Sequence, residues 1–121
     1  MAKSPVAAAP AAAASINWLS VLNQVIAAVA GVLGPKWGSV SQPATHELYV
    51  LTETARWIEE NKASMDEDTY NLLVDAHKRT LHDVLVGNEL IKKAIADQAV
   101  AAAWAVILTA LKSAGKFPFP I

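Results

Sequence analysis

The chain contains no cysteine, so it can form neither a disulfide framework nor a thiolate metal site. Aromatic residues are also scarce, since two Phe, two Tyr and four Trp make up 7% of the sequence. Runs of β-branched residues, which favour strands, are few. These absences argue against a disulfide-stapled miniprotein and against a β-rich domain.

Acidic residues are missing from both ends of the sequence. All eleven lie between Glu47 and Asp97, where six basic residues accompany them and the net charge is −5. The basic residues outside this segment are Lys3, Lys36, Lys112 and Lys116. The whole chain has a net charge of −1 and therefore lacks the basic excess with which proteins hold phosphates. We expect no nucleic-acid partner.

Alanine dominates what is present, with 24 of the 121 residues. Because alanine is the best helix former, the composition predicts an all-α protein. The length suits one domain. We predict a single antiparallel up-down four-helix bundle over residues 15–121.

Residues 1–14 form an Ala/Pro-rich segment in which Pro5 and Pro10 oppose a continuous helix. We predict a flexible, disordered arm. A signal peptide is the alternative, but its hydrophobic stretch would be nearly all alanine and broken by Pro10. We therefore expect an intracellular protein, cytoplasmic or membrane-associated, and not a secreted one.

The first predicted helix covers residues 15–33, with Ser15 as its N-cap and Gly34-Pro35 as its stop. Residues 34–43 are rich in Gly, Ser and Pro and are predicted to form a loop. The second helix is predicted over residues 44–61. The third begins with the capping-box sequence from Ser64 to Glu67.

Gly87 is predicted to separate the third helix from a fourth over residues 88–113, because glycine is costly inside a helix. One bent helix through Gly87 is the alternative. Residues 99–111 of the fourth helix are apolar on all sides apart from Thr109.

No motif supports catalysis. His46-Glu47 could open a zinc-binding His-Glu-x-x-His sequence, but Val50 stands where the second histidine is required. His77 lies on the apolar side of the third helix, either as an ordinary core histidine or as a pH-sensitive one. We expect no enzymatic activity, no metal, no cofactor and no small-molecule substrate.

The two apolar helices, residues 15–33 and 88–113, are the features from which a function can be argued. The first has no charge and ends at Lys36-Trp37, a pairing typical of membrane interfaces. We predict that this helix and the second half of the fourth helix contact a membrane surface or a partner helix. The predicted contact residues are Trp18, Val21, Leu22, Val25, Ile26, Val29, Lys36 and Trp37.

The sequence leaves three interpretations of the two apolar helices open. The apolar helices can be the core pair of an ordinary soluble bundle. They can associate with a membrane, in the extreme as a two-span hairpin with an acidic connecting segment. They can also mediate helix contacts in a homo-oligomer or a self-assembling scaffold.

Overall fold

The computed structural model of the protein describes residues 16–115 and 117–119. It contains α2 (Trp18–Leu33), the short 3-10 helix η2 (Gly34–Lys36), α3 (Trp37–Asn61), α4 (Glu67–Val86) and α5 (Lys93–Ser113). These residues form no strand, which confirms the all-α prediction. The predicted arm, residues 1–14, lies outside the described residues.

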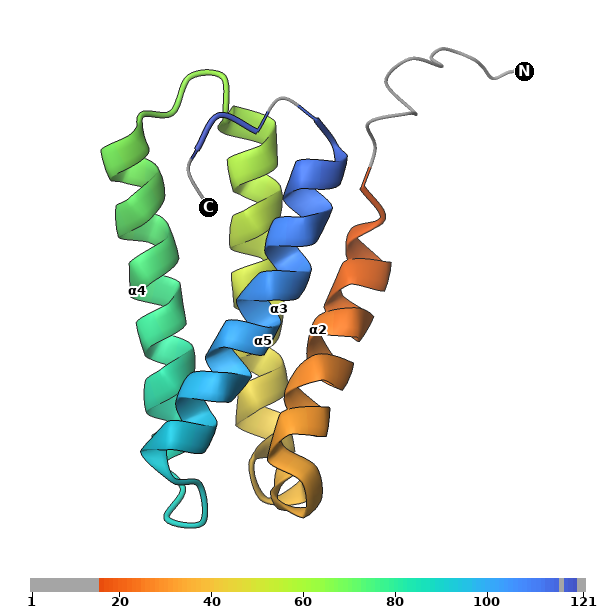
Figure 1. The fold of residues 1–121 in the computed structure, drawn as a ribbon, viewed down its shortest axis with the longest axis vertical. Coiled ribbons are helices and arrows are strands. Elements are labelled where there is room, and N and C mark those ends of the chain that lie inside the picture. The colour runs from red at the N-terminus through yellow and green to blue at the C-terminus, as the bar shows by residue number, and fades with distance from the viewer. Residues whose placement is uncertain (1–15, 116, 120–121) are drawn as a thin grey trace, which may run out of the picture.

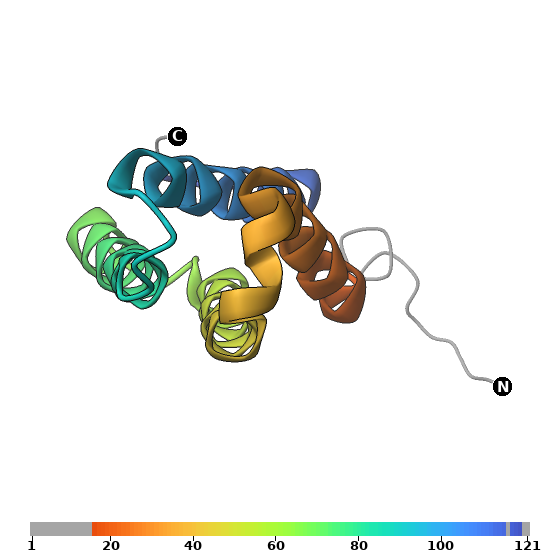
Figure 2. The ribbon, with the colours of Figure 1, turned by 90° about the horizontal axis from the view of Figure 1, so that it is seen from below.

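Consecutive α-helices alternate in direction along the chain (Figure 1). α2 and α3 are joined through η2 without a non-helical residue, so helical structure continues from Trp18 to Asn61. Counted as uninterrupted helical stretches there are therefore three in the described chain, and the predicted count of four separate helices is not confirmed. Each helix contacts its neighbour in the chain, and α5 also packs against α2 (Figure 2).

The N-cap of α2 lies two residues later than predicted. Asn17 is the N-cap, and its Oδ1 accepts a hydrogen bond of 3.0 Å from the backbone amide of Ser20. The predicted cap, Ser15, lies outside the described part of the chain. The C-terminal end at Leu33 is as predicted, with Gly34 at a φ of 58° that favours glycine.

The predicted loop over residues 34–43 is wrong, because α3 already begins at Trp37. Val40 and Ala44 are buried in the core, and this packing outweighs the weak helix preference of Gly38 and the Ser residues. Pro43 lies inside α3 and lacks the amide hydrogen that would bond to the carbonyl of Ser39. Asn88 approaches that carbonyl instead, with Nδ2 at 3.4 Å.

Both ends of α4 are set by local chemistry. Asp66 is its N-cap and accepts a 2.7 Å hydrogen bond from the amide of Thr69, so the predicted capping box from Ser64 is wrong by two residues. α4 ends at Val86, which confirms the break at Gly87 and excludes the single bent helix. α5 begins at Lys93, five residues later than predicted, and ends at Ser113 as predicted.

A single apolar core runs along the molecule, and a smaller cluster closes one end. The core draws buried side chains from all four α-helices, among them Leu48, Leu51 and Ala55 of α3. The smaller cluster joins Ile58, Tyr70 and Val74 to Phe119, beyond α5. Tyr70 and Phe119 stack with ring centroids 4.3 Å apart.

The C-terminal end of α5 is tied to the α3–α4 connection by one lysine. Lys62 donates a 2.8 Å hydrogen bond to the carbonyl of Gly115 and contacts Glu59 at 3.0 Å. This hydrogen bond holds Gly115 beside the α3–α4 connection.

Candidate interaction face

α2 buries one line of side chains against the other helices. Val21, Val25, Val29 and Leu33 recur every four residues and keep at most 6% of their surface exposed. Three of these were predicted contact residues. They lie in the core, so a partner or a bilayer can touch them only if α2 leaves the bundle.

The other predicted contact residues lie at the edge of the same core. Trp18, Leu22 and Ile26 are half-buried and pack against it, as does Trp37 at the start of α3. Lys36 is half-buried in η2, and its carbonyl accepts a 2.7 Å hydrogen bond from the Ser39 hydroxyl. The eight predicted residues therefore do not form one exposed patch in this structure.

The surface that α2 leaves exposed carries no charge. Asn23, Gln24, Ala27 and Gly31 are exposed on its outer side, and the helix has no charged residue. The side of α2 opposite its line of apolar residues is thus the side that faces away from the core. Its polar groups are amides, hydroxyls and backbone, which are less costly to remove from water than ions.

α5 presents a similar surface beside it. Gln98, Ala101, Ala105 and Thr109 are exposed, whereas the opposite side of the helix is buried in the core. α5 carries only three charged residues, Lys93, Asp97 and Lys112, all within its first and last turns or close to them. We call the exposed uncharged surface of these two helices the α2–α5 face. Its residues are Asn23, Gln24, Ala27 and Gly31 of α2 and Gln98, Ala101, Ala105 and Thr109 of α5.

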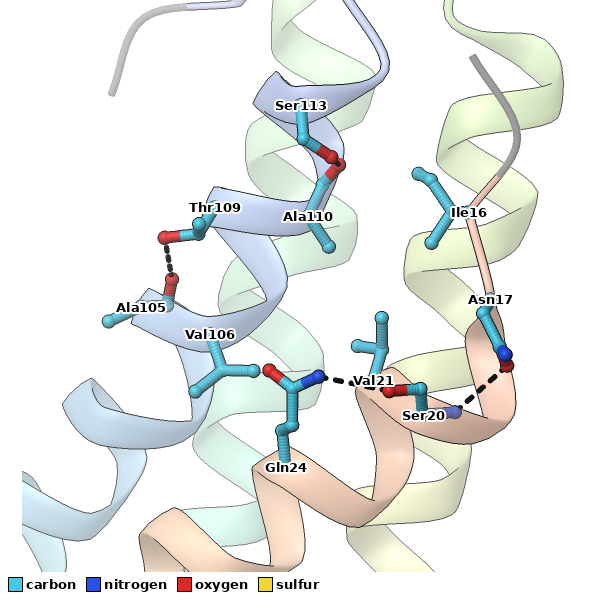
Figure 3. A pocket seen from close by; sticks show the side chains of 10 residues that line it. All are labelled: Ile16, Asn17, Ser20, Val21, Gln24, Ala105, Val106, Thr109, Ala110 and Ser113. Atoms are coloured by element: carbon cyan, nitrogen blue, oxygen red, sulfur yellow. Dashed lines mark hydrogen bonds between the residues drawn. The ribbon is translucent and has the colours of Figure 1, made fainter. Parts of the chain in front are cut away.

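A groove of about 510 Å³ lies between the N-terminal half of α2 and the C-terminal half of α5 (Figure 3). No charged side chain of residues 16–115 or 117–119 lines it. Its lining residues are Ile16, Asn17, Ser20, Val21, Gln24, Ala105, Val106, Thr109, Ala110 and Ser113. The groove lies where the side chains of the two helices do not meet.

The polar groups of the groove are bonded mainly within their own helices. Gln24 donates to the hydroxyl of Ser20 at 3.0 Å. The Thr109 hydroxyl donates to the carbonyl of Ala105, and the Ser113 hydroxyl to that of Ala110. Because these donors are satisfied inside each helix, the groove walls need no charged ligand and suit an uncharged occupant.

Two histidines contact neighbouring helices. Nε2 of His77 lies 3.2 Å from the hydroxyl of Thr54 on α3, and the ring is half-buried. The pH-sensitive role of His77 stays a prediction. Nε2 of His82 on α4 lies 2.8 Å from a carboxylate oxygen of Asp97 on α5, but the two atoms are not aligned for a hydrogen bond, and this buried nitrogen has no hydrogen-bond partner among the described residues.

Sequence reasoning named the second half of the fourth predicted helix as a contact surface, but it did not identify the exposed side of α5 and it missed the groove. It recognised that residues 99–111 are apolar, but an all-round apolar helix has no pattern that tells its inner side from its outer side. A signal was present nonetheless in the charges, since Asp97 and Lys112 lie on the exposed side.

Two helical stretches are long and apolar enough to cross a membrane by length and composition, Trp18–Asn61 and Lys93–Ser113. In their most apolar windows only 22% and 33% of the residues are buried. The described chain is therefore a small all-helical protein with two apolar helices that could span a membrane or mediate an interaction. No protein-family model matches the chain, and no curated protein or solved structure shows detectable similarity to it.

Proposed function

We propose that this protein is a non-catalytic helical interaction module whose contact surface is the α2–α5 face. Its four α-helices act together as one antiparallel four-helix bundle. The face works while the bundle stays folded, because Val21, Val25 and Val29 are needed in the core.

The distribution of charge over the helices carries this proposal. α3 and α4 hold eleven charged residues, whereas α2 has none and α5 has three. Removing charges from water costs several kcal/mol per ion, of the order estimated for buried ion pairs. A partner that covers the α2–α5 face avoids this cost, but one that covers α3 and α4 does not.

Membrane association is a second candidate, supported by the low burial of the two apolar helices. The 21 residues of α5 span about 31 Å, close to the hydrocarbon thickness of a bilayer. The 16 residues of α2 span about 24 Å, and Asn17, Ser20 and Gln24 would be expensive in lipid. This candidate therefore favours attachment to a membrane surface over a two-span hairpin.

The proposal is tested by introducing charge on the face. Ala27→Glu with Ala105→Glu places one carboxylate on each helix, at positions that are exposed and so compatible with folding. Ala76→Glu is the matched control, because Ala76 is exposed on the outer side of α4. Circular dichroism and thermal melting confirm that each variant folds.

Two measurements report the contact, sedimentation velocity over a range of concentrations and flotation with phosphatidylcholine–phosphatidylglycerol vesicles. We expect the wild type to self-associate or to float, the double variant to lose that behaviour, and Ala76→Glu to retain it. A wild type that is a monomer and does not float, or a double variant that behaves like the control, contradicts the proposal.

A further inference from the structure

We propose that the α2–α5 face binds a second copy of this chain, with the α5 helices of the two copies packed antiparallel. This inference rests on the proposed function and names its partner. It is carried by the arrangement of exposed side chains and charges along α5.

The exposed side of α5 follows the repeat of two supercoiling helices. Spacings of four and three residues alternate along an outer row, whose members are Ala94, Gln98, Ala101, Ala105, Leu108 and Lys112. All are exposed except Leu108, which is half-buried. Because this 3.5-residue period stays in line with a neighbouring helix, the row can face the same helix over its whole length.

The charges beside this row favour one orientation. Lys93 and Asp97 lie near its N-terminal end, the Asp97 side chain being 59% exposed, and Lys112 closes its C-terminal end. No charged residue lies between Asp97 and Lys112. An antiparallel pair brings Asp97 of each copy to Lys112 of the other, whereas a parallel pair places Lys112 beside Lys112.

This charge pairing also sets the register of the two helices. The residues midway between Asp97 and Lys112 are Trp104 and Ala105, so the two-fold axis passes close to Ala105. In this register Ala101 of one copy lies opposite Leu108 of the other. A small residue opposite a large one allows the helix axes to approach closely.

The groove shows that the side chains of the described residues do not close this face. Ala105 and Thr109 form part of both the groove wall and the exposed surface of α5. The two-fold symmetry presents the same uncharged surface from each copy, as an isologous interface requires.

Sedimentation velocity of the full chain over a range of concentrations tests the inference directly. We expect a reversible dimer, with a dissociation constant raised about tenfold or more by Ala105→Glu, since the two glutamates would meet at the axis. Ala76→Glu on α4 should leave the constant unchanged. Asp97→Lys and Lys112→Asp should each weaken the dimer, and the double exchange should restore it.

Engineered cysteines determine the orientation, since the chain has none of its own. With Ala105→Cys we expect a disulfide-linked dimer under mild oxidation, because the two residues approach at the axis. With Ala94→Cys we expect none, because antiparallel helices hold these residues at opposite ends. Efficient cross-linking through residue 94 would overturn the antiparallel arrangement.

The remaining outcomes separate this inference from the proposed function. A wild type that is monomeric at all concentrations but floats with vesicles, and loses flotation in the Ala27→Glu, Ala105→Glu variant, overturns the second copy and leaves the α2–α5 face intact. A dimer that Ala105→Glu does not weaken overturns the role of α5. A monomer that also fails to float overturns both.

Discussion

Asp66 and Tyr70 show how single residues begin a helix and fill one end of the bundle. Asp66 caps α4 from an exposed position, whereas Tyr70 is buried one turn later among aromatic rings. The ring of Tyr70 stacks on Phe119 and meets the edge of Phe117 at a centroid distance of 5.7 Å. Their surroundings move the two pKa values in opposite directions.

Burial raises the pKa of the Tyr70 phenol above its ordinary value of about 10. The folded protein thus favours the neutral phenol, and stability falls as pH rises from about 10 through the pKa of the folded state. Urea unfolding between pH 8 and pH 11 should show a loss that is smaller in Tyr70→Phe. Tyr49→Phe is the control, because Tyr49 is half exposed, and an identical alkaline loss in all three proteins contradicts the assignment.

Hydrogen bonds from the amide and then the hydroxyl of Thr69 lower the pKa of the Asp66 carboxyl. The stabilisation by this cap is therefore complete above about pH 4 and is lost as pH falls through the lowered pKa. We expect Asp66→Ala to reduce the melting temperature at pH 7 and Asp66→Asn, which still caps, to reduce it less. The advantage of the wild type over both variants should shrink as pH falls towards 2, whereas the difference between the Asn and Ala variants, which do not titrate, should persist. A wild-type advantage that stays constant from pH 7 to pH 2 would count against a charged cap.

At the scale of one element, α3 is longer than its composition suggests and contains a proline. Pro43 leaves the carbonyl of Ser39 without its partner four residues on. Asn88, from the connection between α4 and α5, reaches that carbonyl and also accepts a 2.8 Å bond from the amide of Leu90. One side chain thus shapes its own turn and contacts the proline-containing segment of α3.

Pro43→Ala should stabilise the protein by about 1–2 kcal/mol. Proline costs about 3 kcal/mol in a helix interior, and the greater freedom of the unfolded chain with alanine at this position offsets part of the gain. Asn88→Asp keeps the acceptor for Leu90, replaces the donor to Ser39 by an acceptor and adds a negative charge. It should destabilise the wild type by about 0.5 kcal/mol.

The destabilisation by Asn88→Asp should become smaller in the Pro43→Ala background, because the backbone at position 43 then supplies an amide hydrogen to the carbonyl of Ser39. A double-mutant cycle by urea unfolding measures this coupling. Equal effects of Asn88→Asp in both backgrounds would show that the contact with Ser39 contributes nothing.

At the scale of the whole molecule, two clusters and one charge pattern define the architecture. The main core and the aromatic cluster share Trp104 and Phe117 as partly buried neighbours, so the segment after α5 packs against both. Phe119 is 7% exposed although it lies close to the C-terminus. Phe117 and Phe119 thereby contribute to the stability of α3 and α4 at their connected ends.

Phe119→Ala should destabilise the protein by about 2–4 kcal/mol, near the lower part of the range for buried phenylalanine, because a chain end can relax into the space. Leu72→Ala is the control, since Leu72 is 72% exposed and should change stability by at most about 0.5 kcal/mol. Thermal and urea unfolding provide the comparison. A loss for Phe119→Ala no larger than that for Leu72→Ala would mean that the C-terminal segment does not support the bundle.

Much of the fold could be predicted because local signals were unambiguous. Gly34, Gly87 and Gly115 mark the ends of α2, α4 and α5. The prediction failed where local and tertiary preferences disagree. Residues 37–43 have the composition of a loop, but burial of Val40 makes them helical, and burial energy is not visible in a short sequence window.

The candidate site was predicted less well than the fold. The apolar pattern of α2 marked Val21, Val25 and Val29 as contact residues, yet the same pattern belongs to any helix packed in a core. The second half of α5 was predicted as a contact surface, but its exposed side was not identified, because alanine is compatible with both interior and surface.

The sequence by itself determined the helical character of the chain, the positions of several helix ends and the concentration of acidic residues in the middle. These depend on intrinsic propensity and on charge, which are properties of neighbouring residues in the chain. Only the tertiary structure decided that α2 and α5 lie side by side, that their uncharged sides face outward, and that a groove remains between them. Those outcomes depend on packing among helices far apart in sequence, which selects the buried side of each alanine-rich helix.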